Sequence, residues 1–479
     1  FVGTLQASDR YAFVVPDQNN MPVDIYITKD QIRGAKNGEK VIAKISDWPA
    51  KSKNPFGEIV EILGMPGENE VEMLSILANN DWPLHFPKKA EKEAEKIPVE
   101  IPQEEIKRRR DMRKITTLTI DPADAKDFDD ALSLQTLENG NYEVGVHIAD
   151  VSYYVKPGSE IDKEAFERAT SVYLVDRTIP MLPEKLSNGL CSLRPNEDKL
   201  CFSAIFELDE NAKVIKQWFG KTIINSDRRF NYEEVQVMIE GEGGDLKEEI
   251  MILDRLAKKL REKRFKAGSI NFHSQEVKFK LDEDGKPLEA FIKEQKDSNK
   301  LIEDFMLLAN RKVAERVGKR PKDKEADTFV YRIHDTPNPD KLADFAEFVS
   351  KLGYKLSIGN RKNIAKSMND LFRDIAGKGE ENMIETIAIR TMAKAVYSTE
   401  NIGHYGLAFP HYTHFTSPIR RYPDLMVHRL LEHYLNKGKS VPKEQYEEYC
   451  KHCSEQERKA VEAERDSIKY KQAEFMLDK

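Results

Sequence analysis

The first 64 residues contain five short runs in which apolar and polar positions partly alternate. In chain order they read FVGTLQAS, YAFVVPD, VDIYI, KVIAKISDW and GEIVEILG, each with β-branched or aromatic residues. This pattern predicts half-buried β-strands, and no helical pattern interrupts the series. Five such strands predict a small OB-type β-barrel over residues 1–64. A purely structural barrel that binds no ligand remains an alternative for this stretch, since its charges balance.

Residues 65–115 have a different character. The segments VEMLSILANNDW and KKAEKEAEKI read as two short helices divided by prolines. A basic cluster, KRRRDMRK at residues 107–114, could contact phosphates, but a solvated linker helix is the favoured interpretation. We therefore predict a helical linker between two domains.

From residue 116 onward, strands and helices alternate without internal repeats, which predicts one large mixed α/β domain over residues 116–479. The tail from residue 442 is predicted to be a helix that ends this domain. Its apolar positions recur at helical spacing, at Tyr446, Tyr449, Cys453, Val461 and Ile468. The predicted fold class is therefore α+β, with a small barrel followed by a large mixed domain.

The composition narrows the class of protein. No apolar run approaches the roughly 18 to 20 residues that a membrane span needs, so we predict no membrane segment. Four cysteines in 479 residues do not form a disulfide framework, which favours a reducing, cytoplasmic setting. The net charge of −7 does not exclude a nucleic-acid partner, because a basic channel can lie on an acidic body. The chain begins without Met inside a strand-like run, so we expect a fragment of a longer protein.

The segment TLTIDPADAKDFDDALS carries the most informative chemistry. Asp121 closes a strand-like run, and Asp127, Asp129 and Asp130 follow within nine residues. Carboxylates this close repel one another and would stay partly protonated unless a cation compensated them. Hard divalent ions prefer oxygen ligands, and Mg²⁺ combines a few carboxylates with phosphate oxygens of a substrate. The cluster therefore indicates a metal site.

Two other interpretations of the acidic segment are weaker. An EF-hand calcium loop that starts at Asp127 would place Glu138 correctly, but Ala131 occupies position five and Leu132 stands where Gly is required. A solvated acidic loop is disfavoured because Phe128 and other apolar residues lie between the acids and indicate a packed segment.

The motif T-I-D-x-x-D-A-K-D-F-D-D-A resembles the signature of the ribonuclease II / ribonuclease R catalytic domain. Further blocks resemble the family in the same order: VGVHIADVSYYV, TSVYLVDRTIPMLPEKLSNGLCSLRP, GSINF, LIEDFMLLAN, YRIHDTP and HYTHFTSPIRRYPDLMVHR. The resemblance covers essentially the whole chain. It implies a Mg²⁺ site formed by four aspartates, which are Asp121, Asp127, Asp129 and Asp130 in this sequence.

The resemblance also implies an activity. We expect a hydrolytic, processive 3′-to-5′ exoribonuclease that degrades single-stranded RNA with a free 3′ end to 5′-mononucleotides. Two Mg²⁺ ions are expected, with Mn²⁺ able to substitute, and the protein is expected to be a monomer. The blocks at residues 171–195 and 416–424 are more similar to ribonuclease R than to ribonuclease II. Whether the enzyme is of the ribonuclease R or the ribonuclease II type decides whether structured RNA is a substrate.

Individual residues are expected to have different roles. Asp129, which is flanked by acids, is the residue whose loss is expected to damage catalysis most. The family position of Arg420 implies that it donates a charge-assisted hydrogen bond to the phosphate. Arg421 competes for that role, with a structural ion pair to Asp424 as its alternative. The residues alone would assign Tyr173 and Phe272 to a core, but both hold the positions of aromatic rings that, in the family, stack on the 3′-terminal bases.

The barrel also resembles a known module. DRYAFVVPD is similar to the first RNA-binding strand of a cold-shock domain and VDIYI to the second, so Phe13 and Tyr26 would present stacking faces. Ala12 stands where Gly is usual, and Tyr26 replaces a Phe. This resemblance predicts a cold-shock-like RNA-binding barrel.

Competing hypotheses remain open at this point. A catalytically inactive RNA-binding protein of the same fold is the main alternative, and retention of all four aspartates argues against it. A metal-dependent phosphatase would leave the barrel without a purpose. The pair Cys450 and Cys453 lacks a second half-site for zinc. The remaining candidates are His404, His411 and His414, read as structural or RNA-contacting, and Glu462 and Glu464, either of which could lie near the RNA 3′ end.

Overall fold

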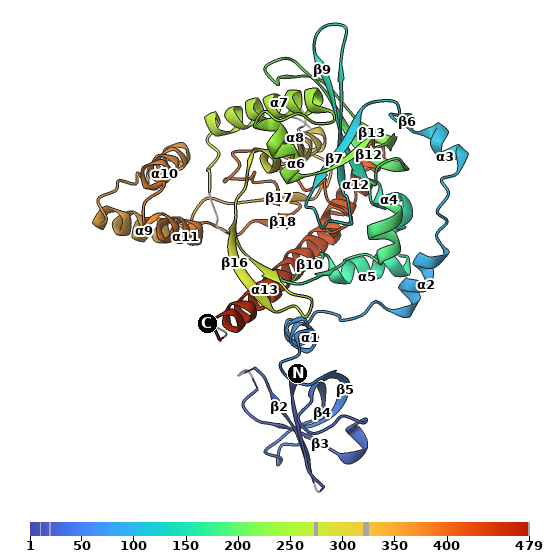
Figure 1. Ribbon diagram of the computed structural model, residues 1–479, viewed down its shortest axis with the longest axis vertical. Coiled ribbons are helices and arrows are strands. Elements are labelled where there is room, and N and C mark those ends of the chain that lie inside the picture. The colour runs from blue at the N-terminus through green and yellow to red at the C-terminus, as the bar shows by residue number, and fades with distance from the viewer. Residues whose placement is uncertain (10, 19–20, 273–275, 320–324, 478–479) are drawn as a thin grey trace.

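The computed structural model describes residues 1–9, 11–18, 21–272, 276–319 and 325–477. Figure 1 shows a small β-barrel at one end, a large domain that contains most of the helices and strands, and a long C-terminal helix. This arrangement confirms the predicted fold class of a small barrel followed by a large mixed α/β domain. None of the helices in the described ranges is long and apolar enough to span a bilayer.

The barrel closes in the strand order β1-β2-β3-β5-β4. Its strands are β1 (Val2–Ala7), β2 (Ala12–Pro16), β3 (Ile25–Ile27), β4 (Lys40–Asp47) and β5 (Phe56–Gly64), with a short helix η1 (Lys29–Gln31). Alternate residues point inward, so that Leu5, Val14 and Ile25 are fully buried. The five predicted strands are therefore confirmed. On each strand, the residues that alternate with the buried ones face outward.

The linker contains α1 (Asn69–Asn79), α2 (Lys88–Lys96) and α3 (Gln103–Arg108), and the first two confirm the predicted helices. The prediction of a solvated basic helix over residues 107–114 is wrong. The helix ends at Arg108, and the chain continues into strand β6 (Arg110–Asp111). The Arg109 side chain is buried and donates to Asp150 at 2.7 Å, so this cation is committed to an internal ion pair.

The large domain is built on a seven-stranded sheet with the order β14-β7-β8-β9-β12-β13-β6. The strands besides β6 are β7 (Thr117–Asp121), β8 (Asp130–Thr136), β9 (Tyr142–Ala149), β12 (Asp198–Leu208), β13 (Val214–Asn225) and β14 (Arg228–Asn231). Neighbouring strands from β7 to β13 pair antiparallel. The edge strands β14 and β6 pair in parallel with β7 and β13, respectively. The helices α6 (Tyr232–Ile239), α7 (Lys247–Lys266) and α8 (Asp297–Gly318) contribute buried residues to the same core.

Between β9 and β12 the chain forms α4 (Val151–Tyr154), α5 (Glu160–Arg168), the short hairpin β10 (Val172–Tyr173) and β11 (Thr178–Ile179), and η2 (Lys185–Leu190). A second hairpin, β15 (Glu276–Leu281) and β16 (Pro287–Lys293), contacts the long helix α13 (Lys443–Leu477). Helix α13 confirms the predicted helical tail, and it runs beside α1 and β10 as well (Figure 1).

The remaining elements are β17 (Tyr331–Ile333), β18 (Val396–Ser398), α12 (Tyr422–Leu435) and the three helices α9 (Pro339–Lys351), α10 (Arg361–Ile375) and α11 (Glu381–Thr391). Helices α9 to α11 enclose a hydrophobic cluster of their own and project to one side of the large domain (Figure 1). The site described next lies instead where β7, β8, β10 and the segment before α12 meet.

Candidate active site

The acidic segment lies between two neighbouring strands of the central sheet. Asp121 ends β7 and Asp130 begins β8, and the two strands pair antiparallel. The end of the connection is packed, since Phe128 is buried and its backbone N–H donates to the Ser192 hydroxyl at 3.0 Å, whereas residues 122–124 and 126 are exposed. The prediction of a packed segment is therefore confirmed at Phe128 and Asp129, but not for the exposed residues that precede them.

Asp129 is the most enclosed of the four carboxylates, with 5% of its surface exposed. Its Oδ1 accepts a hydrogen bond from the Ile419 N–H at 2.9 Å, and its Oδ2 lies 3.3 Å from Nε of Arg420. Its backbone carbonyl accepts from the N–H of Ala149 at 2.9 Å. Asp129 thus joins the acidic segment to residues 290 positions further along the chain.

Burial dominates the electrostatics of the cluster. It raises the pKa of Asp121 to about 8, an effect that the negative charge of Asp130 reinforces. Burial also raises the pKa of Asp130 to about 6 and that of Asp129 well above its ordinary value, although the Arg420 guanidinium opposes both changes. Burial raises the pKa of Asp127 in the same way. The protein alone does not stabilise four charged carboxylates here.

The donor set suits a hard divalent cation, but the ligands are not arranged around one point. Oδ2 of Asp121 is buried and has no hydrogen-bond partner among the described residues, and a cation would satisfy such an oxygen. However, in the described part of the chain no group of three or more His, Cys, Asp or Glu side chains has the geometry to hold a metal ion. The carboxylate chemistry therefore fits Mg²⁺, and the site of four converging ligands stays a prediction.

The two neighbouring arginines have different surroundings. Arg421 donates two hydrogen bonds to Asp424, at 2.9 and 2.8 Å, and Asp424 is fully buried. Arg420 is 40% exposed, contacts Asp129 and donates from Nη2 to the Ser417 hydroxyl at 2.8 Å. Arg421 thus makes the structural ion pair weighed as its alternative, and Arg420 is the arginine of this pair that contacts Asp129.

The segment that carries Arg420 is attached to the strand that carries Tyr173. The carbonyl of Arg420 accepts from the N–H of Ser171 at 3.0 Å and from the Thr170 hydroxyl at 3.2 Å. The ring of Tyr173 is 40% exposed. Burial of its hydroxyl raises the pKa of Tyr173 to about 12, and the charges of Arg420 and Asp127 also act on this group. The structure therefore brings Tyr173 beside the acidic cluster.

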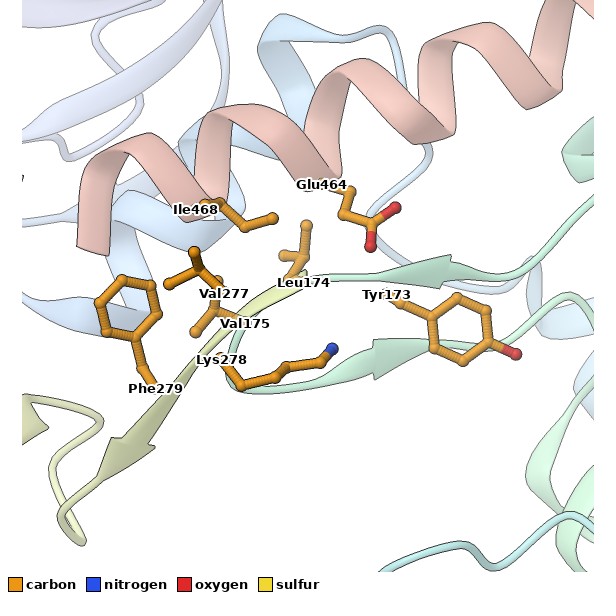
Figure 2. Close-up of a pocket in the computed structure, with 8 residues that line it drawn as sticks. All are labelled: Tyr173, Leu174, Val175, Val277, Lys278, Phe279, Glu464 and Ile468. Atoms are coloured by element: carbon orange, nitrogen blue, oxygen red, sulfur yellow. The ribbon is translucent and has the colours of Figure 1, made fainter. Parts of the chain in front are cut away.

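A small pocket lies on the side of Tyr173 that faces α13 (Figure 2). Residues from three segments line it: Tyr173, Leu174, Val175, Val277, Lys278, Phe279, Glu464 and Ile468. Of the two glutamates that the sequence left open, Glu464 reaches this pocket, whereas Glu462 is exposed. The helical register of α13 decides between them, because residues two positions apart point to different faces.

Phe272 lies in different surroundings from Tyr173. Its ring centroid is 5.5 Å from that of Phe372 on α10, and it packs against the hydrophobic cluster of α9 to α11. The second aromatic residue that lines the pocket is Phe279, from β15, and it lies at the opposite end of the pocket from Tyr173 (Figure 2). The predicted partnership of Phe272 and Tyr173 on one RNA end therefore stays a prediction, which no contact between the two rings supports.

Phe13 and Tyr26 belong to a row of four aromatic rings on the outside of the barrel. Their ring centroids lie 5.4 Å apart, and the two residues are register partners on β2 and β3. Tyr11 extends the row at one end, 5.7 Å from Phe13, and Phe56 at the other, 5.2 Å from Tyr26. Sequence reasoning missed both flanking rings. The spacing of Tyr11 from Phe13 could have revealed the first, because alternate strand residues share a face.

The cysteines are buried in the interior, and the three candidate histidines are partly buried. Nδ1 of His414 lies 2.8 Å from the Tyr397 hydroxyl, and burial lowers the pKa of His414 well below its ordinary value. Burial likewise lowers the pKa of His404 to about 3. The cysteines are free, buried thiols: Cys191, Cys201, Cys450 and Cys453. His404, His411 and His414 are all partly exposed, and their interpretation as structural or RNA-contacting stays a prediction.

Comparison with known families places two domains on this chain. Residues 109–437 match the model of the RNB domain, and residues 13–87 match that of the cold shock domain. A curated relative, ribonuclease R of Thermotoga maritima, is 39% identical over 99% of this chain and 68% of its own length. The chain therefore spans about two thirds of that relative.

Solved structures agree with this similarity. Ribonuclease R of Mycoplasma genitalium, in complex with ribose-methylated single-stranded RNA, superimposes with a TM-score of 0.91 at 25% identity, covering 99% of this chain and 76% of that one. The yeast pseudonuclease Ssd1 superimposes with a TM-score of 0.77 at 22% identity, covering 98% of this chain and 59% of that one. At that identity the likeness to Ssd1 concerns the fold alone.

Proposed function

This chain belongs to the RNB family of exoribonucleases, among the ribonucleases R, and we propose that it hydrolyses single-stranded RNA processively from the 3′ end to 5′-mononucleotides. The proposed centre consists of Asp121, Asp127, Asp129 and Asp130 with Mg²⁺, together with Arg420. We further propose that the protein acts as a cytoplasmic monomer. Its four free, buried cysteines are compatible with a reducing compartment.

One observation carries the proposal: Asp129 and Arg420 meet, although 291 positions separate them. Nε of Arg420 lies 3.3 Å from Oδ2 of Asp129, and the neighbouring Ile419 N–H holds the other carboxylate oxygen. An exposed guanidinium beside a cluster of buried carboxylates combines groups for cation binding and for phosphate binding. That combination fits phosphodiester hydrolysis better than it fits a structural ion pair.

Each residue has a distinct proposed task. The carboxylates would hold Mg²⁺, which supplies charge stabilisation and an activated water for phosphoryl transfer when bound. Arg420 would donate to the phosphate oxygens as negative charge increases there. Its exposure allows this, because part of the guanidinium surface faces solvent rather than Asp129.

The aromatic residues would grip the RNA without reading its sequence. Tyr173 stands beside the acids and would stack on a base at the 3′ end, with Phe272 as a second ring. Phe13 and Tyr26, flanked by Tyr11 and Phe56, offer faces for bases further along the strand. Stacking of this kind tolerates any base, because every base presents a flat π-face.

The test is digestion of a 5′-labelled single-stranded RNA in Mg²⁺, in Mn²⁺ and in chelator, with a duplex of the same sequence in parallel. We expect a descending ladder, release of 5′-mononucleotides and loss of activity in chelator. A trap of unlabelled RNA, added after initiation, reports processivity. Nucleoside diphosphates that form only with added phosphate would indicate phosphorolysis instead. Binding without cleavage in any metal would favour the catalytically inactive alternative.

A further inference from the structure

Strand β10, which carries Tyr173, packs against the first linker helix, α1. Its neighbours Val172 and Leu174 are 1% and 7% exposed, and they pack in one cluster with Met73 and Leu77 of α1. Small residues of α13 complete this cluster. The backbone on both sides of Tyr173 is therefore fixed by contacts that include α1.

A polar contact joins the same helix to the turn after β10. Asn69, the first residue of α1, donates from Nδ2 to Oδ2 of Asp176 at 2.7 Å. Asp176 also accepts from Arg177 at 2.8 Å, and Arg177 pairs with Glu70. The Asp176 side chain is only 8% exposed, so its hydrogen bonds are shielded from water and contribute more than an exposed surface pair would.

Asn69 also contacts the turn of the second hairpin. Gly285 has a φ of +80°, and a Cβ at this position would lie 2.5 Å from Nδ2 of Asn69. The carbonyl of Gly285 accepts from Nζ of Lys471, a fully buried residue of α13, at 2.6 Å. Asn69 thus lies between the turn that follows Tyr173 and the turn of the β15–β16 hairpin, which α13 holds through Lys471.

We infer that Asn69 is a positioning residue for Tyr173, so that α1 sets where the ring stands and how short an RNA the enzyme still grips. The hairpin of β10 and β11 has only two residue pairs, Val172 with Ile179 and Tyr173 with Thr178. Such a short hairpin has little stability of its own and takes its position from its neighbours. The inference rests on the proposed stacking role of Tyr173.

The substitution Asn69→Asp tests this inference, because it replaces a hydrogen-bond donor with a carboxylate next to Asp176. We expect the shortest product from 5′-labelled RNA to lengthen by at least one nucleotide. The initial rate on a long RNA should stay within about twofold, since many other bases remain stacked. The matched control is Asn79→Asp, which makes the same change at the opposite end of α1 and should leave the product unchanged.

A double variant separates positioning from general loosening of the structure. If Asn69 acts through Tyr173, Asn69→Asp combined with Tyr173→Ala should give the same shortest product as Tyr173→Ala alone. Additive lengthening would overturn the inference, as would an unchanged product from folded Asn69→Asp. If Asn69→Asp does not fold, Asp176→Ala removes the same contact from the other side and is judged by the same outcomes.

The same experiment distinguishes the inference from its premise. An unchanged product from Tyr173→Ala would refute the proposed stacking role, and the inference with it. A longer product from Tyr173→Ala, without one from Asn69→Asp, would refute the positioning role of Asn69 alone.

Discussion

Asp129→Asn separates the catalytic charge of the acidic cluster from its structural role. In the parent, the Ile419 N–H lies 2.9 Å from Oδ1 of Asp129, and Nε of Arg420 lies 3.3 Å from Oδ2. In the variant, the amide oxygen can still accept from the Ile419 N–H, while the NH₂ group takes the place of Oδ2. The stability cost should be small, because burial already disfavours the charged form of Asp129, and the substitution removes repulsion from Asp127 and Asp130 together with the attraction to Arg420. Folding should survive, and RNA affinity should hold or rise.

The cleavage rate should nevertheless fall by about 1,000-fold or more, equivalent to about 4 kcal/mol of transition-state stabilisation, because an amide is a poor Mg²⁺ ligand. We would compare single-turnover cleavage with RNA binding for the variant and the parent. Asp124→Asn is the matched control, since Asp124 is exposed in the same segment and should tolerate the change. Cleavage near the parental rate in folded Asp129→Asn would mean that the acidic cluster is not the active site.

Three further predictions concern other parts of the molecule. Arg421→Met should lower the free energy of unfolding by roughly 3–5 kcal/mol, because it leaves the buried carboxylate of Asp424 without its cationic partner. Arg420→Met should mainly slow cleavage, so equal melting temperatures for the two variants would contradict this prediction. Phe13→Ala should weaken RNA binding by about 1–3 kcal/mol without changing the single-turnover rate at saturation, which titration would measure. Although burial opposes it, Lys221 and Arg109 hold the pKa of Asp150 well below its ordinary value. Asp150→Asn should therefore lower the free energy of unfolding at neutral pH, and the difference from the parent should shrink only in acid, below about pH 4. A difference that stays constant across pH would refute this prediction.

Local patterns were enough to predict the elements whose burial depends on near neighbours. The barrel strands alternate over a few residues each, and α13 repeats its apolar face over many turns, so both could be found from periodicity. The basic cluster misled the prediction because charge alone does not reveal a distant partner. Arg109 is buried among partners that include the nearby Glu105 but also Asp150, 41 positions later, and the carbonyls of Cys201 and Thr222.

The same limit applies to the site. The acids Asp121 to Asp130 are adjacent in sequence, and their spacing alone indicated a metal site. The choice between Arg420 and Arg421 could not be made from spacing, since it depends on which guanidinium the buried Asp424 binds. Family position favoured Arg420, and the geometry supplies a physical reason for that preference.

The contacts around Tyr173 show why its support could not be predicted. Asn69 precedes Asp176 by 107 positions, and Lys471 follows Gly285 by 186, so no local pattern links these residues. Each is also an ordinary residue for a helix or turn, with nothing in its neighbours to mark it. Residues that act on substrate belong to recognisable motifs, whereas a residue that positions them needs only a suitable contact in the folded chain. Asn69→Asp is therefore a sharper probe of how the linker affects the product than any change within the motifs themselves.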